Sequence, residues 1–118
     1  MNDHAPTARR VLPAMLAGLS LGMLAGGMAL LAAFVSAGAG HGDYVAARLL
    51  FPYSMLLTLV EGRIGAVSLA IGLAQFPAYG ALLGWLRARR NPAAALALAG
   101  LHLVAAMACF TGILPNFS

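Results

Sequence analysis

The sequence predicts an all-α fold, a polytopic bundle of transmembrane helices, and three observations support this prediction. Hydrophobic residues make up 62% of the 118-residue chain and charged residues only 8%, whereas an ordinary soluble domain carries about 25% charged residues. The mean hydropathy is +0.89. The charges are confined to the N-terminal tail and to short breaks between long apolar runs. This pattern is typical of a protein that crosses a membrane several times.

The first predicted helix follows a polar N-terminal tail, residues 1–10. Residues 11–40 carry no charge, and this run is longer than the roughly 20 residues that cross a hydrocarbon core. The apolar region of a secretory signal is only about 7 to 15 residues long. We therefore expect an uncleaved first membrane helix over about 11–38.

The second predicted helix, about 44–60, is short and contains a proline. It follows a turn with His41 and Asp43, and the Asp43 side chain is expected to cap a helix that starts at Tyr44. Pro52 removes one helix hydrogen bond and predicts a kink. The segment is therefore either a short, kinked span or a re-entrant piece.

Two further spans complete a single transmembrane domain over 11–115. Glu61 and Arg63 form a tight turn, in which their charges are expected to compensate each other, and an uncharged helix follows over about 64–86. Asn91 and Pro92 form a helix start signal, because asparagine caps and proline fits the first helical position. The last helix is predicted over about 92–114, followed by a C-terminal tail, residues 116–118.

Two rules disagree on the number of crossings. Arginine and lysine beside spans are retained on the cytoplasmic side. With the N-terminus inside, four crossings would place three arginines inside and four outside, which is no bias. Three crossings would place five inside (Arg9, Arg10, Arg87, Arg89, Arg90) and two outside (Arg48, Arg63). Helical spans satisfy backbone groups in lipid most simply, so we expect four membrane helices and leave the orientation open.

The first span contains a stripe of small residues, Gly18, Gly22 and Gly26. This GxxxGxxxG spacing gives a flat face on which another helix backbone can approach closely, and packing drives helix association in lipid. The partner is either another span of the same chain or a second copy. A Gly22→Leu substitution is expected to weaken association, whereas His102→Ala is expected to leave it largely intact.

Polar residues recur near the middle of the last two spans. On the third helix Ser68, Gln75 and Tyr79 share one face, and His102 lies near the middle of the fourth. Polar groups at that depth are costly unless they are paired, so they are expected to face the bundle interior. We expect a hydrogen bond between Gln75 and His102, worth about 0.6 to 2 kcal/mol. The alternative is a proton relay or a ligand contact.

The sequence indicates no metal site, cofactor or catalytic centre. His41 and Asp43 lie in an interfacial loop, whereas His102 lies deep in its helix, so they cannot share one ion. A haem held by two histidines would need His102 from two copies. Seven arginines split among four places do not form a nucleic-acid surface. No acid–base pair, nucleophile or phosphate loop indicates an enzyme.

These observations predict a small, multi-pass integral membrane protein. The leading hypothesis is a non-catalytic accessory or assembly subunit, which forms homo-oligomers or joins a larger membrane complex through its small-residue faces. The alternatives are an oligomeric carrier of ions, protons or small solutes that uses Gln75 and His102, and a haem- or quinone-binding subunit. Lysine is absent, and Ala, Gly, Leu and Arg dominate. This composition is typical of a GC-rich bacterial genome, so the expected location is a bacterial inner membrane.

Overall fold

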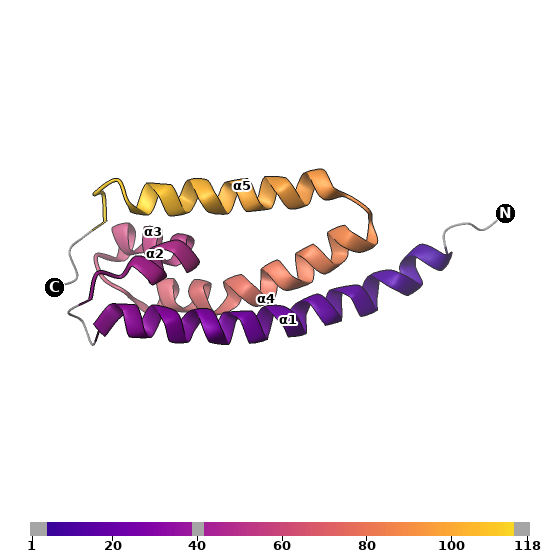
Figure 1. The fold of residues 1–118 in the computed structure, drawn as a ribbon, viewed down its shortest axis with the longest axis horizontal. Coiled ribbons are helices and arrows are strands. Elements are labelled where there is room, and N and C mark those ends of the chain that lie inside the picture. The colour runs from indigo at the N-terminus through magenta and orange to yellow at the C-terminus, as the bar shows by residue number, and fades with distance from the viewer. Residues whose placement is uncertain (1–4, 39–41, 115–118) are drawn as a thin grey trace.

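The fold is a bundle of helices, and the prediction of an all-α protein is confirmed. The computed structural model describes residues 5–38 and 42–114, in which every regular element is a helix. Three long helices lie along the length of the molecule, and two short ones lie between them near one end (Figure 1). In chain order the helices are α1 (Ala5–Ala37), α2 (Val45–Leu50), α3 (Pro52–Glu61), α4 (Ala66–Ala88) and α5 (Pro92–Cys109).

Among the described residues, three helices are long and apolar enough to cross a membrane: Arg9–Ala37 of α1, all of α4 and all of α5. The expected count of four spans is not confirmed. The second segment is divided into α2, of 6 residues, and α3, of 10 residues. At 1.5 Å per residue they reach about 9 and 15 Å, so neither crosses a hydrocarbon core of about 30 Å. Pro52 has no N–H to continue α2 and starts α3 as its first residue.

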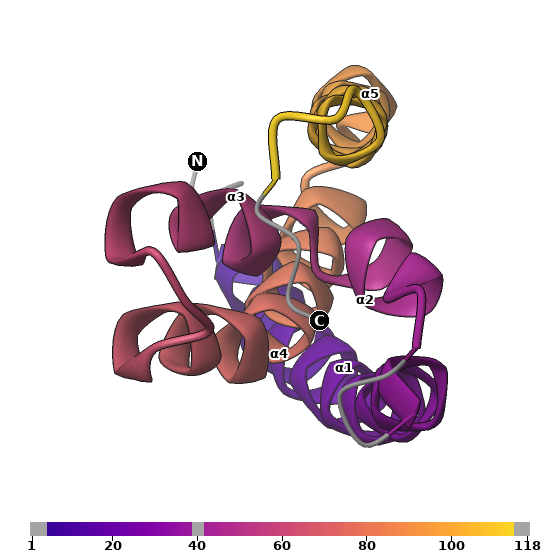
Figure 2. The ribbon, with the colours of Figure 1, turned by 90° about the vertical axis from the view of Figure 1, so that its left-hand side faces the viewer.

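The two short helices form a hairpin, defined here as residues 44–62 and called the re-entrant hairpin because it enters and leaves at the same end of the bundle. The α1–α2 loop and the α3–α4 turn both lie at this end, called the hairpin end (Figure 1). The α4–α5 turn and the start of α1 lie at the opposite end, called the arginine end. Viewed from the hairpin end, α2 and α3 lie between α5 and the α1–α4 pair (Figure 2).

A short polar network fixes the entry into the hairpin. Asp43 accepts a hydrogen bond from the Val45 N–H at 3.1 Å, and the Ser36 hydroxyl donates to Asp43 at 3.1 Å. The Ala46 N–H donates in turn to the Ser36 hydroxyl at 3.2 Å. Asp43 therefore satisfies a donor at the start of the helix, although α2 begins at Val45 and not at Tyr44 as predicted. His41 lies outside the described residues.

Glu61 fixes the exit from the hairpin. Its carboxylate accepts hydrogen bonds from the Ser68 N–H at 2.9 Å and the Val67 N–H at 3.3 Å, and from the Ser68 hydroxyl. It therefore caps the start of α4, whose first N–H groups have no partner within the helix. This corrects the expected compensation between Glu61 and Arg63, since no ion pair joins them in the described structure. Gly62, at φ 68°, makes the turn possible.

The longest contact in the fold is the antiparallel crossing of α1 and α4, which places the predicted glycine stripe against a second one. A Cβ on Gly18 would overlap the Gly80 carbonyl oxygen, and one on Gly22 would overlap the Phe76 carbonyl. Gly84 meets the Ala14 backbone in the same way. The partner of the stripe is therefore a helix of the same chain. Gly26 lies further along, where a Cβ would be 3.0 Å from the Phe76 Cβ.

The predicted helix boundaries differ from the observed ones mainly at the outer ends. The first helix begins at Ala5, within the predicted tail, and not at residue 11. The last helix ends at Cys109, earlier than the predicted residue 114, since Gly112 adopts φ 84° and the Thr111 hydroxyl bonds back to the Ala108 carbonyl at 2.7 Å. The predicted tail, residues 116–118, lies outside the described residues.

Cysteine labelling of intact membranes tests the crossing number. In a Cys109→Ala background we expect cysteines at Val45 and Arg63 to react from one side of the membrane and a cysteine at Arg89 to react from the other. Four crossings would instead place residues 45 and 89 on the same side. That outcome would contradict the re-entrant hairpin.

Alanine at the α1–α4 crossing tests the glycine contact. We expect Gly18→Ala and Gly80→Ala each to lower the free energy of unfolding by about 1 to 3 kcal/mol, because the added methyl groups force the two backbones apart. Gly27→Ala is the control, since no atom lies within 4 Å of a Cβ built there. Unfolding of the purified protein in mixed micelles with increasing SDS measures the difference. Equal stability of all three variants would be inconsistent with this contact.

Candidate functional site

The candidate site lies at the tip of the re-entrant hairpin, where the chain passes from α2 to α3. Helix α2 ends at Leu50, and the backbone turns at Phe51, with φ −126° and ψ 51°. The carbonyls of Leu49 and Leu50 therefore have no helical N–H to accept from. A carbonyl left without a donor inside lipid or protein costs several kcal/mol, so the tip requires donors from other helices.

Two polar side chains from α4 and α5 supply these donors. The Gln75 amide donates through Nε2 to the Leu50 carbonyl at 2.8 Å, and His102 Nε2 lies 2.9 Å from the Leu49 carbonyl. A carbonyl can only accept, so the His102 proton is on Nε2 and, in the neutral ring, Nδ1 is an acceptor. The Tyr79 hydroxyl, 2.9 Å from Nδ1, therefore donates to it. Tyr79, His102 and the tip backbone form one hydrogen-bonded chain.

The expected hydrogen bond between Gln75 and His102 is not made. Both residues face the bundle interior as predicted from their depth, but each bonds to a different carbonyl of the hairpin tip. The break in the second segment leaves two free carbonyls between Gln75 and His102. A backbone carbonyl is a strong acceptor that must be satisfied, so each side chain bonds to one of them. Gln75 is only 6% exposed.

Aromatic rings surround this hydrogen-bonded chain. The Tyr53 ring centroid lies 6.4 Å from that of Tyr79 and 6.1 Å from that of His102, both in edge-to-face arrangements. Two buried polar atoms of the site, the Tyr53 hydroxyl and Gln75 Oε1, have no hydrogen-bond partner among the described residues. The site can therefore donate and accept further hydrogen bonds inside the bundle.

The rest of the hairpin is fixed by small polar contacts on its buried side. The Ser54 hydroxyl donates to the Ser68 carbonyl at 2.6 Å, and Ser68 is fully buried. The Cys109 thiol lies 3.5 Å from the Pro52 carbonyl and is also fully buried. The predicted polar face of α4, with Ser68, Gln75 and Tyr79, is thus the face that holds the hairpin. Burial raises the importance of these few hydrogen bonds, because water does not compete for them.

Sequence reasoning did not select Tyr53, Ser54 or the two carbonyls of the tip. The useful signal was Pro52, since a proline can break a membrane helix, and a carbonyl exposed at such a break must be satisfied by another group. The sequence did not indicate which polar side chains would reach that carbonyl. Both candidate donors were selected from their depth in the spans.

The two acidic loop residues lie apart from the tip and act as caps. The pKa of the Asp43 carboxyl is below its ordinary value, mainly because the Val45 N–H and the Ser36 hydroxyl donate to it. The pKa of the Glu61 carboxyl is lowered mainly by the hydroxyl and the N–H of Ser68. Both groups are therefore ionised at neutral pH. Arg63 is exposed in the α3–α4 turn.

The donor set at the tip does not fit a metal ion or a haem iron. The described residues contain no cluster of three or more His, Cys, Asp or Glu side chains that could hold a metal. Both ring nitrogens of His102 already have partners, so ligation of an iron would have to break one of these bonds. The chemistry available is hydrogen bonding by an amide, an imidazole and two phenols.

The fold defines a class of protein: a small helical chain with three helices able to span a membrane and a hairpin inserted between them from one end. No protein-family model, curated protein or solved structure matches the chain significantly.

Removing a donor at the tip tests whether these bonds fix the hairpin. We expect Gln75→Leu and His102→Leu each to lower the free energy of unfolding by about 1 to 3 kcal/mol, because a buried carbonyl loses its donor. Leu98→Ala, on the same side of α5 as His102, serves as a packing control. A second readout is labelling of a Ser54→Cys reporter in a Cys109→Ala background, which we expect to become faster only in the donor variants. Unchanged labelling would mean that the hairpin is held by packing alone.

Proposed function

We propose that this chain is a non-catalytic assembly subunit that resides in a membrane. It associates with a second copy of itself through the outer face of α5. The carrying observation is a stripe of mainly small residues on α5 that point away from the bundle: Ala93, Ala97 and Gly100, followed by the larger Val104. All four are exposed, and no atom lies within 4 Å of a Cβ built on Gly100.

The stripe fits a helix partner because its residues recur at helical spacing. Positions 93, 97, 100 and 104 lie within about 60° of one another around the helix. The buried residues of α5, Ala105, Ala106 and Cys109, lie on the other side. Small residues on a membrane helix allow close approach of another backbone. A two-fold axis would place the same stripe of a second copy against it.

The glycine stripe of α1 does not offer this association. Gly18 and Gly22 are already in contact with α4, so they hold the fold of one chain. The expected effect of Gly22→Leu is revised accordingly, from a loss of association to a loss of folding. The exposed stripe of α5 is therefore proposed as the association surface instead of the glycine stripe of α1.

The alternative of a small-solute, ion or proton carrier has one observation in its favour. Gln75 Oε1 and the Tyr53 hydroxyl are buried without partners, which leaves polar groups free for a water or a small polar solute. The haem alternative is less well supported, because His102 has no free ring nitrogen.

Energy transfer between labelled copies in vesicles tests the proposed association. We expect Gly100→Leu to weaken association by about tenfold, equivalent to about 1.4 kcal/mol, because the side chain blocks close approach of the helices. Gly27→Leu is the matched control, a second open glycine on α1, and should associate as the unaltered chain does. His102→Ala should also leave association largely intact.

Three results would overturn the proposal. Association that is unchanged by Gly100→Leu would exclude the α5 stripe as the interface between copies. Solute or proton flux through reconstituted vesicles that is abolished by His102→Ala would favour the carrier. An association that requires a different membrane protein would replace the second copy with a larger complex.

A further inference from the structure

The arginine end of the bundle carries a positive charge that no described acidic side chain balances. Arg9 and Arg10 lie at the start of α1, and three more arginines, Arg87, Arg89 and Arg90, lie at the α4–α5 turn. Both described acidic residues, Asp43 and Glu61, lie at the hairpin end and are used as caps there. The Arg89 guanidinium lies over the Trp85 ring, 5.2 Å from its centroid. In the described structure Arg87 and Arg90 have no ion-pair partner.

Arg87 and Arg90 line a cavity between α4 and α5. This arginine cavity has a volume of about 400 Å³, and Asn91 is its third polar residue. Its walls are otherwise apolar and include Leu83 and Ala95. It lies beside the N-terminus of α5, where the helix dipole also favours a negative charge.

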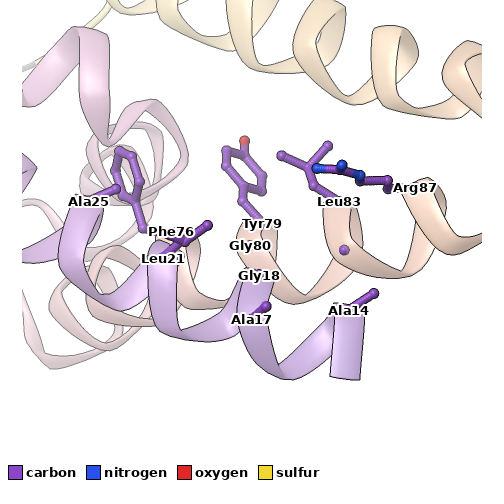
Figure 3. Close-up of a pocket in the computed structure, with 12 residues that line it drawn as sticks. Ala14, Ala17, Gly18, Leu21, Ala25, Phe76, Tyr79, Gly80, Leu83 and Arg87 are labelled. Carbon is purple, nitrogen blue, oxygen red and sulfur yellow. The ribbon is translucent and has the colours of Figure 1, made fainter. Parts of the chain in front are cut away.

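A second, apolar hollow lies on the other side of Arg87. This α1–α4 groove has a volume of about 510 Å³ and shares Leu83 and Arg87 with the arginine cavity. Its α1 wall is low because the side chains of Ala14 and Ala17 are small. In Figure 3 Tyr79 projects from α4 toward α5, and the Arg87 side chain runs back along α4 beside that of Leu83. The α1–α4 groove therefore extends from the Arg87 guanidinium along an apolar surface.

We infer that an anionic phospholipid binds at the arginine end, with its phosphate between Arg87 and Arg90 and an acyl chain along the α1–α4 groove. The headgroup matches the two unpaired guanidinium groups, since arginine binds phosphate oxygens through two parallel hydrogen bonds. The acyl chain of the lipid matches the apolar walls of the α1–α4 groove. Basic pockets between transmembrane helices are the usual sites for anionic lipid headgroups.

A lipid fits these features better than a free phosphate ion. A free ion would use the arginine cavity and leave the groove without a role, whereas a lipid occupies both through Arg87, which they share. The five arginines also place this end on the cytoplasmic side by the positive-inside rule, where anionic lipids give the leaflet its negative potential. The inference does not depend on the α5 stripe and its association.

The single tryptophan, Trp85, provides a probe at the depth of the site, because it lies between Leu83 and Arg87 on α4, about 3 Å from each along the helix axis. The full chain is reconstituted in phosphatidylcholine vesicles with increasing fractions of either brominated phosphatidylglycerol or brominated phosphatidylcholine. We expect the anionic lipid to quench Trp85 fluorescence at a lower fraction, with a relative association constant at least about fivefold higher. The Arg87→Gln/Arg90→Gln double variant should lose this preference.

A matched control separates a site from diffuse charge at the membrane surface. Arg9→Gln/Arg10→Gln removes the same charge from the same end without altering the arginine cavity, and should retain the preference. Ala17→Leu fills the groove, keeps every arginine, and should weaken quenching by the anionic lipid. Helical content measured by circular dichroism verifies that each variant is folded.

Four results would overturn the inference. These are equal quenching by the two lipids, a preference that survives in Arg87→Gln/Arg90→Gln, an equal loss in Arg9→Gln/Arg10→Gln, and unchanged quenching in Ala17→Leu. A fifth contrary result, competition by millimolar inorganic phosphate, would assign the arginine cavity to a free ion instead of a lipid.

Discussion

Lipid offers no hydrogen-bond partner to a backbone carbonyl, and the rest of this structure depends on how the carbonyls at the hairpin tip are satisfied. The break at Phe51 and Pro52 leaves Leu49 and Leu50 without helical donors. Gln75 from α4 and His102 from α5 provide them. The same two bonds that satisfy the break also hold α4 and α5 to the hairpin, so the position of α5 follows from the interruption in the second segment.

Helices α1 and α5 are held in the bundle by different kinds of contact. Helices α1 and α4 meet through glycines, whose backbones approach more closely than any larger side chain allows. Helix α5 is held near the hairpin end, where Ala105, Ala106 and Cys109 are buried. Its first half therefore presents an exposed small-residue stripe outward, and beside its N-terminus lies the cavity lined by Arg87 and Arg90.

The two ends of the bundle differ in the charge of their side chains and in whether that charge is used within the chain. At the hairpin end the carboxylates of Asp43 and Glu61 cap helix starts within the chain. At the arginine end the guanidinium groups have no such internal role, apart from the contact of Arg89 with Trp85. Charge that the described chain does not balance internally is available to the surroundings of this end. In the proposed lipid interaction, the asymmetry separates a structural end from an interacting end.

The sequence by itself determined the helical class, the three long apolar helices and the polar face of α4, because each follows from composition or from helical periodicity along one segment. It also indicated that Gln75 and His102 would face inward, since their depth makes exposure to lipid costly. Only the tertiary structure decided that these residues bond to the hairpin backbone and not to each other, and that Gly18 meets Gly80 within one chain. Such pairings depend on which segments lie side by side. Spacing along a single helix carries no information about the helix that faces it.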